Sequence, residues 1–371
     1  MQIDFKKDFF GFTECRLLTN DSADGYQKNQ VFSGFMDGKE YIIKIILNLK
    51  KYCENLEEKD YASNFEWKVL QLFNNDEDLN KNVPKLYEVY RNVKLEDISD
   101  KYFSIDKTQI LEDNLTIIVC EKVVGSLCDY CTELNKATDP VKEWFSFIYV
   151  VLHLVRTYQR KYKIIHNDLN TSNVLIKRGK FVLNEKVQLE TIFPVLWDFE
   201  LSQVYDEQTR EKYGFPKENA CVYEKDELLG DDQDEDPFDM PINSFFNTFS
   251  DVHYILRCLN DEIFRAVPKQ VLDFIEEIYG KDDFNCLGNN SFDEEAYEPY
   301  ESGSDCSSEF FIEDDFGKEF PHGYFLTNDS FLGITTLKYL QDNNESHKRL
   351  LEIDEILEKI LEKIQNIKHE K

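Results

Sequence analysis

The sequence predicts an α+β protein with two lobes, a strand-rich first part and a helix-rich second part. Three observations predict this class. Short apolar, β-branched runs fill the first third of the chain, longer runs with helical spacing follow, and two acidic segments interrupt the pattern. Runs of strands followed by runs of helices are typical of α+β proteins, whereas alternating strands and helices would indicate a parallel sheet.

The first 124 residues contain the expected strands. Residues 29–47 hold two apolar runs around Met36-Asp37-Gly38-Lys39, and an Asp-Gly turn between such runs predicts a β-hairpin. Residues 64–73 place Phe65, Val69 and Phe73 on one side, which predicts a helix. Two further strand-like runs occupy 83–92 and 115–124.

After Gly125 the pattern becomes helical. We expect a long buried helix at 142–160 and a second helix, with one buried face, at 250–259. Short strands are expected between these helices, at 173–177 and 180–184, and an isolated apolar strand at 193–197.

The C-terminal residues 348–367 carry an apolar seam with alternating steps of four and three residues. This spacing predicts a helix, and because the seam is shorter than three heptads we expect it to pack on its own domain. The oligomeric state stays open. The seam consists of Ile353, Leu357, Ile360, Ile364 and Ile367.

Four parts of the chain follow from these patterns. Residues 1–123 form the strand-rich lobe, 124–280 the helical lobe, 281–320 an acidic insert and 321–371 a C-terminal helical extension. The acidic segments at 224–239 and 292–316 are predicted to be loops or inserts, because their charge opposes the burial of a core.

The charge balance limits the partners of this chain. The sequence holds 43 basic and 73 acidic residues, a formal net charge of −30. Such a surface repels phosphate backbones, so nucleic acid is not an expected partner, whereas a basic protein is.

The sequence also indicates a compartment. No secretory signal opens the chain, and the longest apolar run, 144–155, is too short for a bilayer, which takes about 20 residues. The nine cysteines form no disulfide framework and no paired zinc spacing, so we expect reduced thiols in the cytoplasm.

One polar loop interrupts two apolar runs, and its residue types indicate phosphoryl transfer. His166 to Asn173 read H-N-D-L-N-T-S-N, which fits H-x-D-L-x-x-x-N. An acceptor hydroxyl must lose its proton to a base, and the carboxylate of Asp168 fits that role. A neutral amide oxygen five residues later, that of Asn173, can bind Mg²⁺.

Three residues elsewhere complete this chemistry. Asp198 ends an apolar strand in P-V-L-W-D-F-E and is a second candidate ligand for Mg²⁺. Lys44, between isoleucines in a predicted strand, is a candidate for binding ATP phosphates, and Glu66 on the next helix is its expected partner. Each residue alone has a plain structural explanation, as a turn, a solvated strand or an exposed helix position. Their order along the chain favours the functional interpretation.

With these residues in view, the chain resembles the serine/threonine protein kinases of large DNA viruses, most closely the poxvirus type. The resemblance is strong over about 160–260 and weaker over about 25–125, and its motifs include Phe181–Glu185 and Asp198–Val204. It implies a bilobal protein-kinase-like fold, an ATP- and Mg²⁺-dependent activity on protein hydroxyls, and a location in the host cytoplasm or the virion.

The resemblance also implies further site residues. Asp251 would anchor the backbone of the polar loop, and Cys120 would lie at the back of the ATP pocket. The backbone of Glu121 to Val123 would bind adenine. A phosphate-covering loop would precede Val31, where Gly25 is the single glycine left of the usual G-x-G-x-x-G motif.

Three residues depart from the kinase pattern. Asn167 replaces an arginine that usually pairs with a phosphorylated activation loop. Asn170 replaces a catalytic lysine that usually contacts the transferring phosphate, and Glu200 replaces the glycine of D-F-G. No A-P-E motif is present, and an acidic segment stands in its place, which favours basic protein substrates.

Two alternatives stay open. A catalytically weak pseudokinase scaffold would explain the missing glycines and Asn170. A small-molecule phosphotransferase would share the H-x-D motif, although that class usually has H-G-D-L-H-x-x-N and no phenylalanine after the metal-binding aspartate. Asn167, Asn170 and Phe199 therefore favour the protein kinase.

Overall fold

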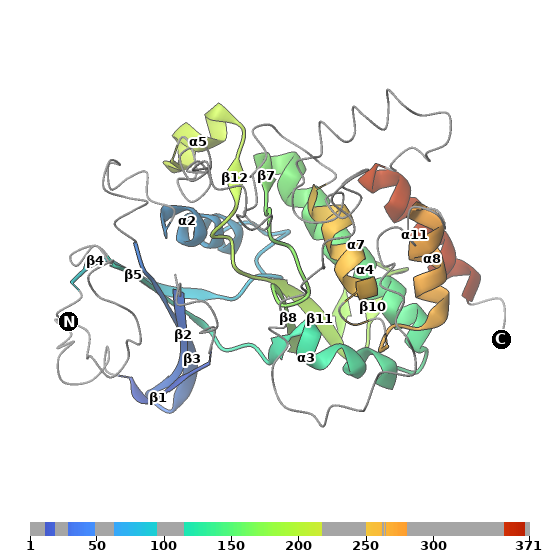
Figure 1. Ribbon diagram of the computed structural model, residues 1–371, viewed down its shortest axis with the longest axis horizontal. Coiled ribbons are helices and arrows are strands. Elements are labelled where there is room, and N and C mark those ends of the chain that lie inside the picture. Colours follow the sequence, from blue (N-terminus) through green and yellow to red (C-terminus); the bar gives the residue numbers. More distant parts are fainter. Residues whose placement is uncertain are drawn as a thin grey trace, which may run out of the picture. The chain divides into compact units, whose positions relative to one another are not determined.

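The computed structural model describes most of the elements predicted above (Figure 1). Contacts divide the chain into two compact units, and each is described on its own. The first contains Met1–Val124, Tyr162–Ile164 and Val195–Glu235, and the second Gly125–Lys161, Ile165–Pro194 and Asp236–Lys371. The described residues are 12–18, 29–48, 63–94, 115–216, 250–261, 263, 265–279 and 352–367. Gly25, both acidic segments and the predicted part 281–320 lie outside these ranges.

The first unit is built on a five-stranded antiparallel sheet in the order β1-β2-β3-β5-β4. Together with the helices described below, this sheet confirms the predicted mixture of α and β structure. The strands are β1 (Thr13–Leu17), β2 (Asn29–Met36), β3 (Lys39–Ile46), β4 (Leu86–Val93) and β5 (Leu115–Glu121).

The hairpin between β2 and β3 confirms the turn prediction. Met36 pairs with Lys39, and the two residues between them have positive φ angles, 52° for Asp37 and 75° for Gly38. This is the type I′ geometry that matches the twist of the flanking strands, and it sets the register of β3. In that register Lys44 lies opposite Val31 on one side and Ile118 on the other.

The two faces of the sheet differ. Because side chains alternate along a strand, Ile43 and Ile45 share one face of β3 while Lys44 occupies the other. The first face forms an apolar core cluster. Its buried members are Phe12, Phe32, Ile43, Ile45, Leu47, Val93, Leu115, Ile117 and Val119.

Helix α2 (Ser63–Asn74) forms as predicted, with Phe65, Val69 and Phe73 fully buried. Two aromatic contacts join it to the segment after β11: Phe199 lies edge-on to Phe73 at 5.3 Å, and Phe215 lies 5.9 Å from Phe65. This segment also contains β12 (Gln203–Val204) and α5 (Glu207–Tyr213). Packing therefore holds the residues around position 198 against the helix that carries Glu66.

The second unit is mainly helical, with short strands. Its three-stranded sheet has the order β11-β8-β6, and β9 pairs with β10. The helices are α3 (Leu127–Tyr130), the 3-10 helix η6 (Cys131–Lys136), α4 (Pro140–Tyr162), α7 (Ser250–Asp261), α8 (Lys269–Tyr279) and α11 (Ile353–Asn366). The strands of this region are β6 (Gly125–Ser126), β7 (Ile164–Ile165), β8 (Val174–Arg178), β9 (Phe181–Val182), β10 (Gln188–Leu189) and β11 (Ile192–Leu196), of which β7 and β11 have residues in both units.

Two strand predictions in this region were wrong in detail. The strand expected at 180–184 is only the two residues of β9, because the side chain of Asn184 accepts hydrogen bonds from the N–H groups of Lys186 and Val187 and turns the chain. The strand expected to be isolated at 193–197 is β11, which begins at Ile192 and belongs to the sheet with β8.

Helix α11 packs on its own unit, as the short seam predicted. Asp354 pairs with Arg156 at 3.0 Å, and Lys363 pairs with Glu277 at 3.0 Å, so α11 contacts α4 and α8. The buried side chains are Ile353, Ile356, Leu357, Ile360 and Ile364. Among the described helices, none is both long and apolar enough to cross a bilayer.

One buried side chain of the sheet has no compensating partner, and this generates a stability prediction. Gln30 on β2 is fully buried, and neither its amide oxygen nor its nitrogen finds a hydrogen-bond partner among the described residues. Gln30→Met should therefore raise the free energy of unfolding by about 1–2 kcal/mol. Urea unfolding measures this change. The exposed control Gln71→Met should change the value by less than about 0.5 kcal/mol, and a destabilised Gln30→Met variant would contradict the prediction.

Candidate active site

The first unit buries a lysine between two carboxylates that come from distant parts of the sequence. The Nζ atom of Lys44 lies 2.7 Å from Oε2 of Glu66 and 2.6 Å from Oδ1 of Asp198. Lys44 is 2% exposed and Glu66 fully buried, whereas Asp198 is 31% exposed. The structure thus brings together the three residues that the sequence predicted as phosphate-binding, pairing and metal-binding side chains.

Each of these residues has a definite structural support. β3 fixes Lys44, and α2 presents Glu66 from its first turn. Asp198 follows β11 and has a φ of 60°, a left-handed conformation that costs a non-glycine residue energy. The fully buried ring of Phe199 fixes the next position against Phe73. The ring of Trp197 lies 5.6 Å from the Lys44 ammonium.

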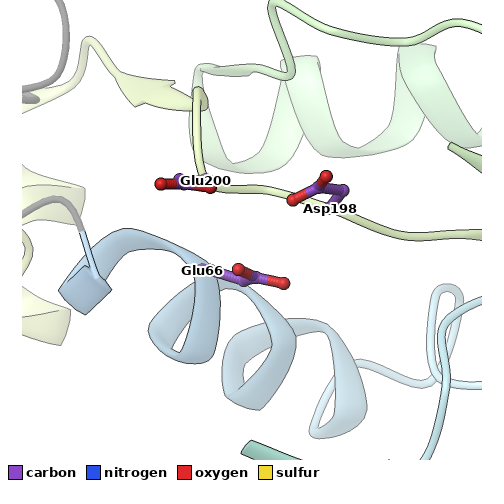
Figure 2. A group of neighbouring side chains, drawn as sticks. All are labelled: Glu66, Asp198 and Glu200. Carbon is purple, nitrogen blue, oxygen red and sulfur yellow. The ribbon is translucent and has the colours of Figure 1, made fainter. Parts of the chain in front are cut away.

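A third carboxylate belongs to this group. One oxygen from each of Glu66, Asp198 and Glu200 lies within 4.8 Å of the others, and Figure 2 shows Glu66 on α2 opposite the segment with Asp198 and Glu200. One ammonium against three carboxylates leaves an excess of negative charge. A divalent cation bound there would offset that excess.

Sequence reasoning assigned Glu200 only a conformational effect, as a glycine replacement. The φ angle of Glu200 is not positive, so its side chain causes no left-handed strain. The signal for the third carboxylate was present in the D-F-E triplet, which spaces two acidic residues around a buried phenylalanine.

The excess of carboxylates changes the proton affinities in this group. Burial raises the pKa of Glu66 to about 8, and the charges of Asp198 and Glu200 act in the same direction, against the opposing effect of Lys44. Burial by itself would lower the pKa of Lys44, but the attraction of Asp198 and Glu66 outweighs it and raises that pKa. The lysine therefore keeps its charge, and Glu66 binds a proton more readily than an exposed glutamate does.

The second unit contains the polar loop, in which two amides hold the carboxylate of Asp168. Nδ2 of Asn170 donates to Oδ1 of Asp168 at 3.0 Å, and Nδ2 of Asn173 donates to Oδ2 at 2.7 Å. Asn173 also donates to the backbone oxygen of Asp168 at 2.8 Å. Both oxygens of the predicted base are thereby oriented.

A buried aspartate holds the backbone of this loop. Asp251 is 1% exposed and accepts hydrogen bonds from the N–H groups of His166, at 2.9 Å, and Asn167, at 2.9 Å. This contact matches the anchor that the resemblance implied. Asn167 has a φ of 65°, a conformation that asparagine tolerates better than most residues.

Sequence reasoning missed Tyr158, which completes this anchor. Its hydroxyl donates to Oδ2 of Asp251 at 2.6 Å, and burial raises the pKa of that hydroxyl well above its usual range. The tyrosine therefore stays a neutral donor to the buried carboxylate. It lies on the apolar side of α4, where the sequence pattern gives no sign of its role.

The remaining predicted residues can be located, with one exception. Val31 lies directly opposite Lys44 in the sheet register. Glu121 ends β5, and its carboxylate accepts a hydrogen bond from the backbone N–H of Lys85 at 3.2 Å. Cys120 and Val123 are buried, and burial raises the pKa of the Cys120 thiol. Gly25 lies outside the described residues.

Two residues, one in each unit, keep polar groups that have no partner among the described residues. Both amide hydrogens of Asn173 are engaged with Asp168, whereas its Oδ1 accepts no hydrogen bond from the described residues and is free to bind a cation. The backbone N–H and carbonyl of Val123 likewise have no partner in the described part of the chain, although the residue is 8% exposed. Such groups are suited to the edge of an adenine ring.

Comparison with known proteins does not assign the chain to a family. No protein-family model matches the chain, and no curated protein matches it. The resemblance to kinases therefore depends on the motifs and on the geometry described above.

The raised pKa of Glu66 generates a pH prediction. Because the raised pKa makes the folded state bind this proton more tightly, while an unfolded glutamate loses it near about pH 4.3, the stability that the proton contributes is complete below about pH 4.3 and is lost as pH rises through the raised pKa of the folded state. Without metal, the free energy of unfolding should decline over this range by at most about 1.4 kcal/mol per pH unit from this group.

The measurement is urea unfolding in EDTA at several pH values, for the wild type and Glu66→Gln. The variant cannot release this proton, so its stability relative to wild type should improve from pH 5 to pH 8. The exposed control Glu88→Gln should follow the wild type. Parallel curves for wild type and Glu66→Gln would show that Glu66 is already ionised at pH 5.

Proposed function

We propose that this protein is an ATP-dependent serine/threonine protein kinase with a bilobal kinase-like fold, of the type found in large DNA viruses. The observation that carries the proposal is the pair of contacts from Lys44 to Glu66 and Asp198. A buried lysine with two carboxylate partners is costly to desolvate. A protein that needed only a stable core at this position would do as well with an apolar side chain, which favours a functional reason for the charge.

The proposed reaction is the transfer of the γ-phosphoryl group to a protein hydroxyl. The hydroxyl oxygen forms a bond to the γ-phosphorus, the bond from that phosphorus to the β–γ bridging oxygen breaks, and ADP leaves. The carboxylate of Asp168 accepts the hydroxyl proton. The two amides that hold Asp168 keep its carboxylate in one orientation, which suits a base that must meet a hydroxyl at a fixed place.

Nucleotide binding is assigned to the first unit's lysine and to backbone groups at and just after the end of β5. Lys44 would bind the phosphates, with Val31 beside it in the sheet, and the backbone of Glu121 and Val123 would bind adenine. Mg²⁺, which neutralises phosphate charge, would be bound by Asp198 in the first unit and by Asn173 in the second. Because the carboxylates around Lys44 outnumber it, we expect ATP to bind only together with a divalent cation.

The substrate class follows from charge. The formal net charge of −30 favours acceptor proteins that are basic, since oppositely charged partners associate faster and like-charged partners are rejected. This assignment makes basic proteins better acceptors than acidic ones at low ionic strength.

The test is transfer of radiolabel from γ-labelled ATP with Mg²⁺, using a basic protein, casein and a panel of small hydroxyl compounds as acceptors. Label should appear on serine or threonine, and more on the basic protein. Asp168→Asn should lower the rate by about a hundredfold to ten-thousandfold, because it removes the base. Asp273→Asn, at a residue 51% exposed on α8, is the matched control and should retain wild-type activity.

Three results would contradict the proposal. Label confined to small acceptors would indicate a small-molecule phosphotransferase. No transfer to any acceptor by folded protein that still binds ATP would indicate a pseudokinase scaffold. Transfer that survives Asp168→Asn unchanged would show that Asp168 is not the base.

A further inference from the structure

Two asparagines of the second unit make the same turn, and only one of them also contacts a carboxylate. Oδ1 of Asn170 accepts hydrogen bonds from the N–H groups of Ser172, at 2.9 Å, and Asn173, at 3.0 Å. Oδ1 of Asn184 accepts from Lys186, at 2.9 Å, and Val187, at 3.0 Å, two and three residues onward in the same way. Both are side-chain turns that asparagine forms readily. Asn170 differs because its Nδ2 donates to Asp168.

Both the oxygen and the nitrogen of the Asn170 side-chain amide therefore form hydrogen bonds inside the loop. Its oxygen fixes the turn that leads to Asn173, and its nitrogen fixes one oxygen of the Asp168 carboxylate. Asn173, whose backbone N–H is held by this turn, fixes the other carboxylate oxygen at 2.7 Å. The Asn170 side chain thus contacts one oxygen of the Asp168 carboxylate directly and helps to hold Asn173, which contacts the other oxygen. The backbone oxygen of Asn170 also accepts from the N–H of Asn173, at 3.2 Å.

We propose that Asn170 is a positioning residue, which orients the Asp168 carboxylate, and that it does not contact the transferring phosphate. This inference rests on the proposed function. It revises the role that the kinase resemblance implies for this position, where a lysine would supply positive charge. A lysine has no acceptor atom, so it cannot form the turn with the N–H groups of Ser172 and Asn173.

The distinction can be measured, because the two roles give opposite effects of the same substitution. If position 170 served the phosphate, Asn170→Lys would restore a missing charge and raise kcat. If it positions Asp168, Asn170→Lys removes the side-chain hydrogen bonds to Asp168, Ser172 and Asn173 and lowers kcat. Asn170→Asp isolates the second contact, because it keeps the acceptor oxygen for the turn but replaces the donor with a carboxylate beside Asp168.

The experiment compares Asn170→Lys and Asn170→Asp with the matched pair Asn184→Lys and Asn184→Asp at the exposed turn. Both Asn170 variants should lower kcat by about tenfold to a hundredfold, because a misplaced base reacts slowly. KM for ATP should change by less than about twofold, since Asn170 does not touch the nucleotide. The Asn184 variants should keep the wild-type kcat. A kcat for Asn170→Lys equal to or above that of the wild type would overturn the inference.

A second readout does not depend on activity. In NMR spectra of asparagine-labelled protein, Asp168→Ala should shift the side-chain NH₂ signals of Asn170 and leave those of Asn184 in place. Unshifted Asn170 signals would overturn the inference even in an active kinase. If the wild type transfers no phosphate but the Asn170 signals shift, the proposed function fails while the contact that positions Asp168 stands.

Discussion

The buried ammonium of Lys44 is the constraint on which the first unit depends. An ionised lysine at 2% exposure must have carboxylate partners, because its desolvation is otherwise unfavourable by several kcal/mol. Glu66 and Asp198 meet this need from a helix and from a segment more than 100 residues later in the chain. The aromatic contacts Phe73–Phe199 and Phe65–Phe215 hold these two parts together. Packing and electrostatics therefore specify the same arrangement.

The carboxylates around Lys44 carry more negative charge than is needed to neutralise this lysine. With Glu200 they outnumber it, which leaves negative charge beside the partly exposed Asp198. Burial raises the pKa of Glu66, and the charges of Asp198 and Glu200 act in the same direction. A site of this kind attracts a divalent cation and rejects a free triphosphate. The charge pattern would thus make the proposed nucleotide binding dependent on a divalent cation.

The polar loop of the second unit is held by hydrogen bonds to amides, N–H groups and a hydroxyl. The carboxylate of Asp168 is held by neutral amides, and the loop backbone is held by the buried carboxylate of Asp251, which accepts from two N–H groups and from the hydroxyl of Tyr158. None of these contacts requires a cation or a phosphate group. The loop is preorganised by hydrogen bonds that lie within its own unit.

The sequence was sufficient to predict the features that depend on local rules or on spacing. The Asp37-Gly38 turn fixed the hairpin, helical spacing located α2 and α4, and motif spacing identified Lys44, Glu66, Asp168, Asn173 and Asp198. What it could not provide were contacts made through three dimensions. The hydroxyl of Tyr158 meets Asp251 from 93 residues away, and Glu200 joins the carboxylates only because Phe199 is buried between it and Asp198. The strand at 180–184 was predicted too long, because the turn at Asn184 that follows β9 depends on one side chain.

Calorimetric titration with ATP tests the central claim, that the buried lysine and its carboxylates form a nucleotide site. The account predicts binding with Mg²⁺ and none in EDTA. It also predicts that Lys44→Met weakens binding by about tenfold to a hundredfold, the range expected for a lost charge-assisted contact, while Lys39→Met, at an exposed residue of the same strand, leaves the affinity unchanged. Equal affinity of folded Lys44→Met and wild type, or binding that does not need a cation, would contradict the account.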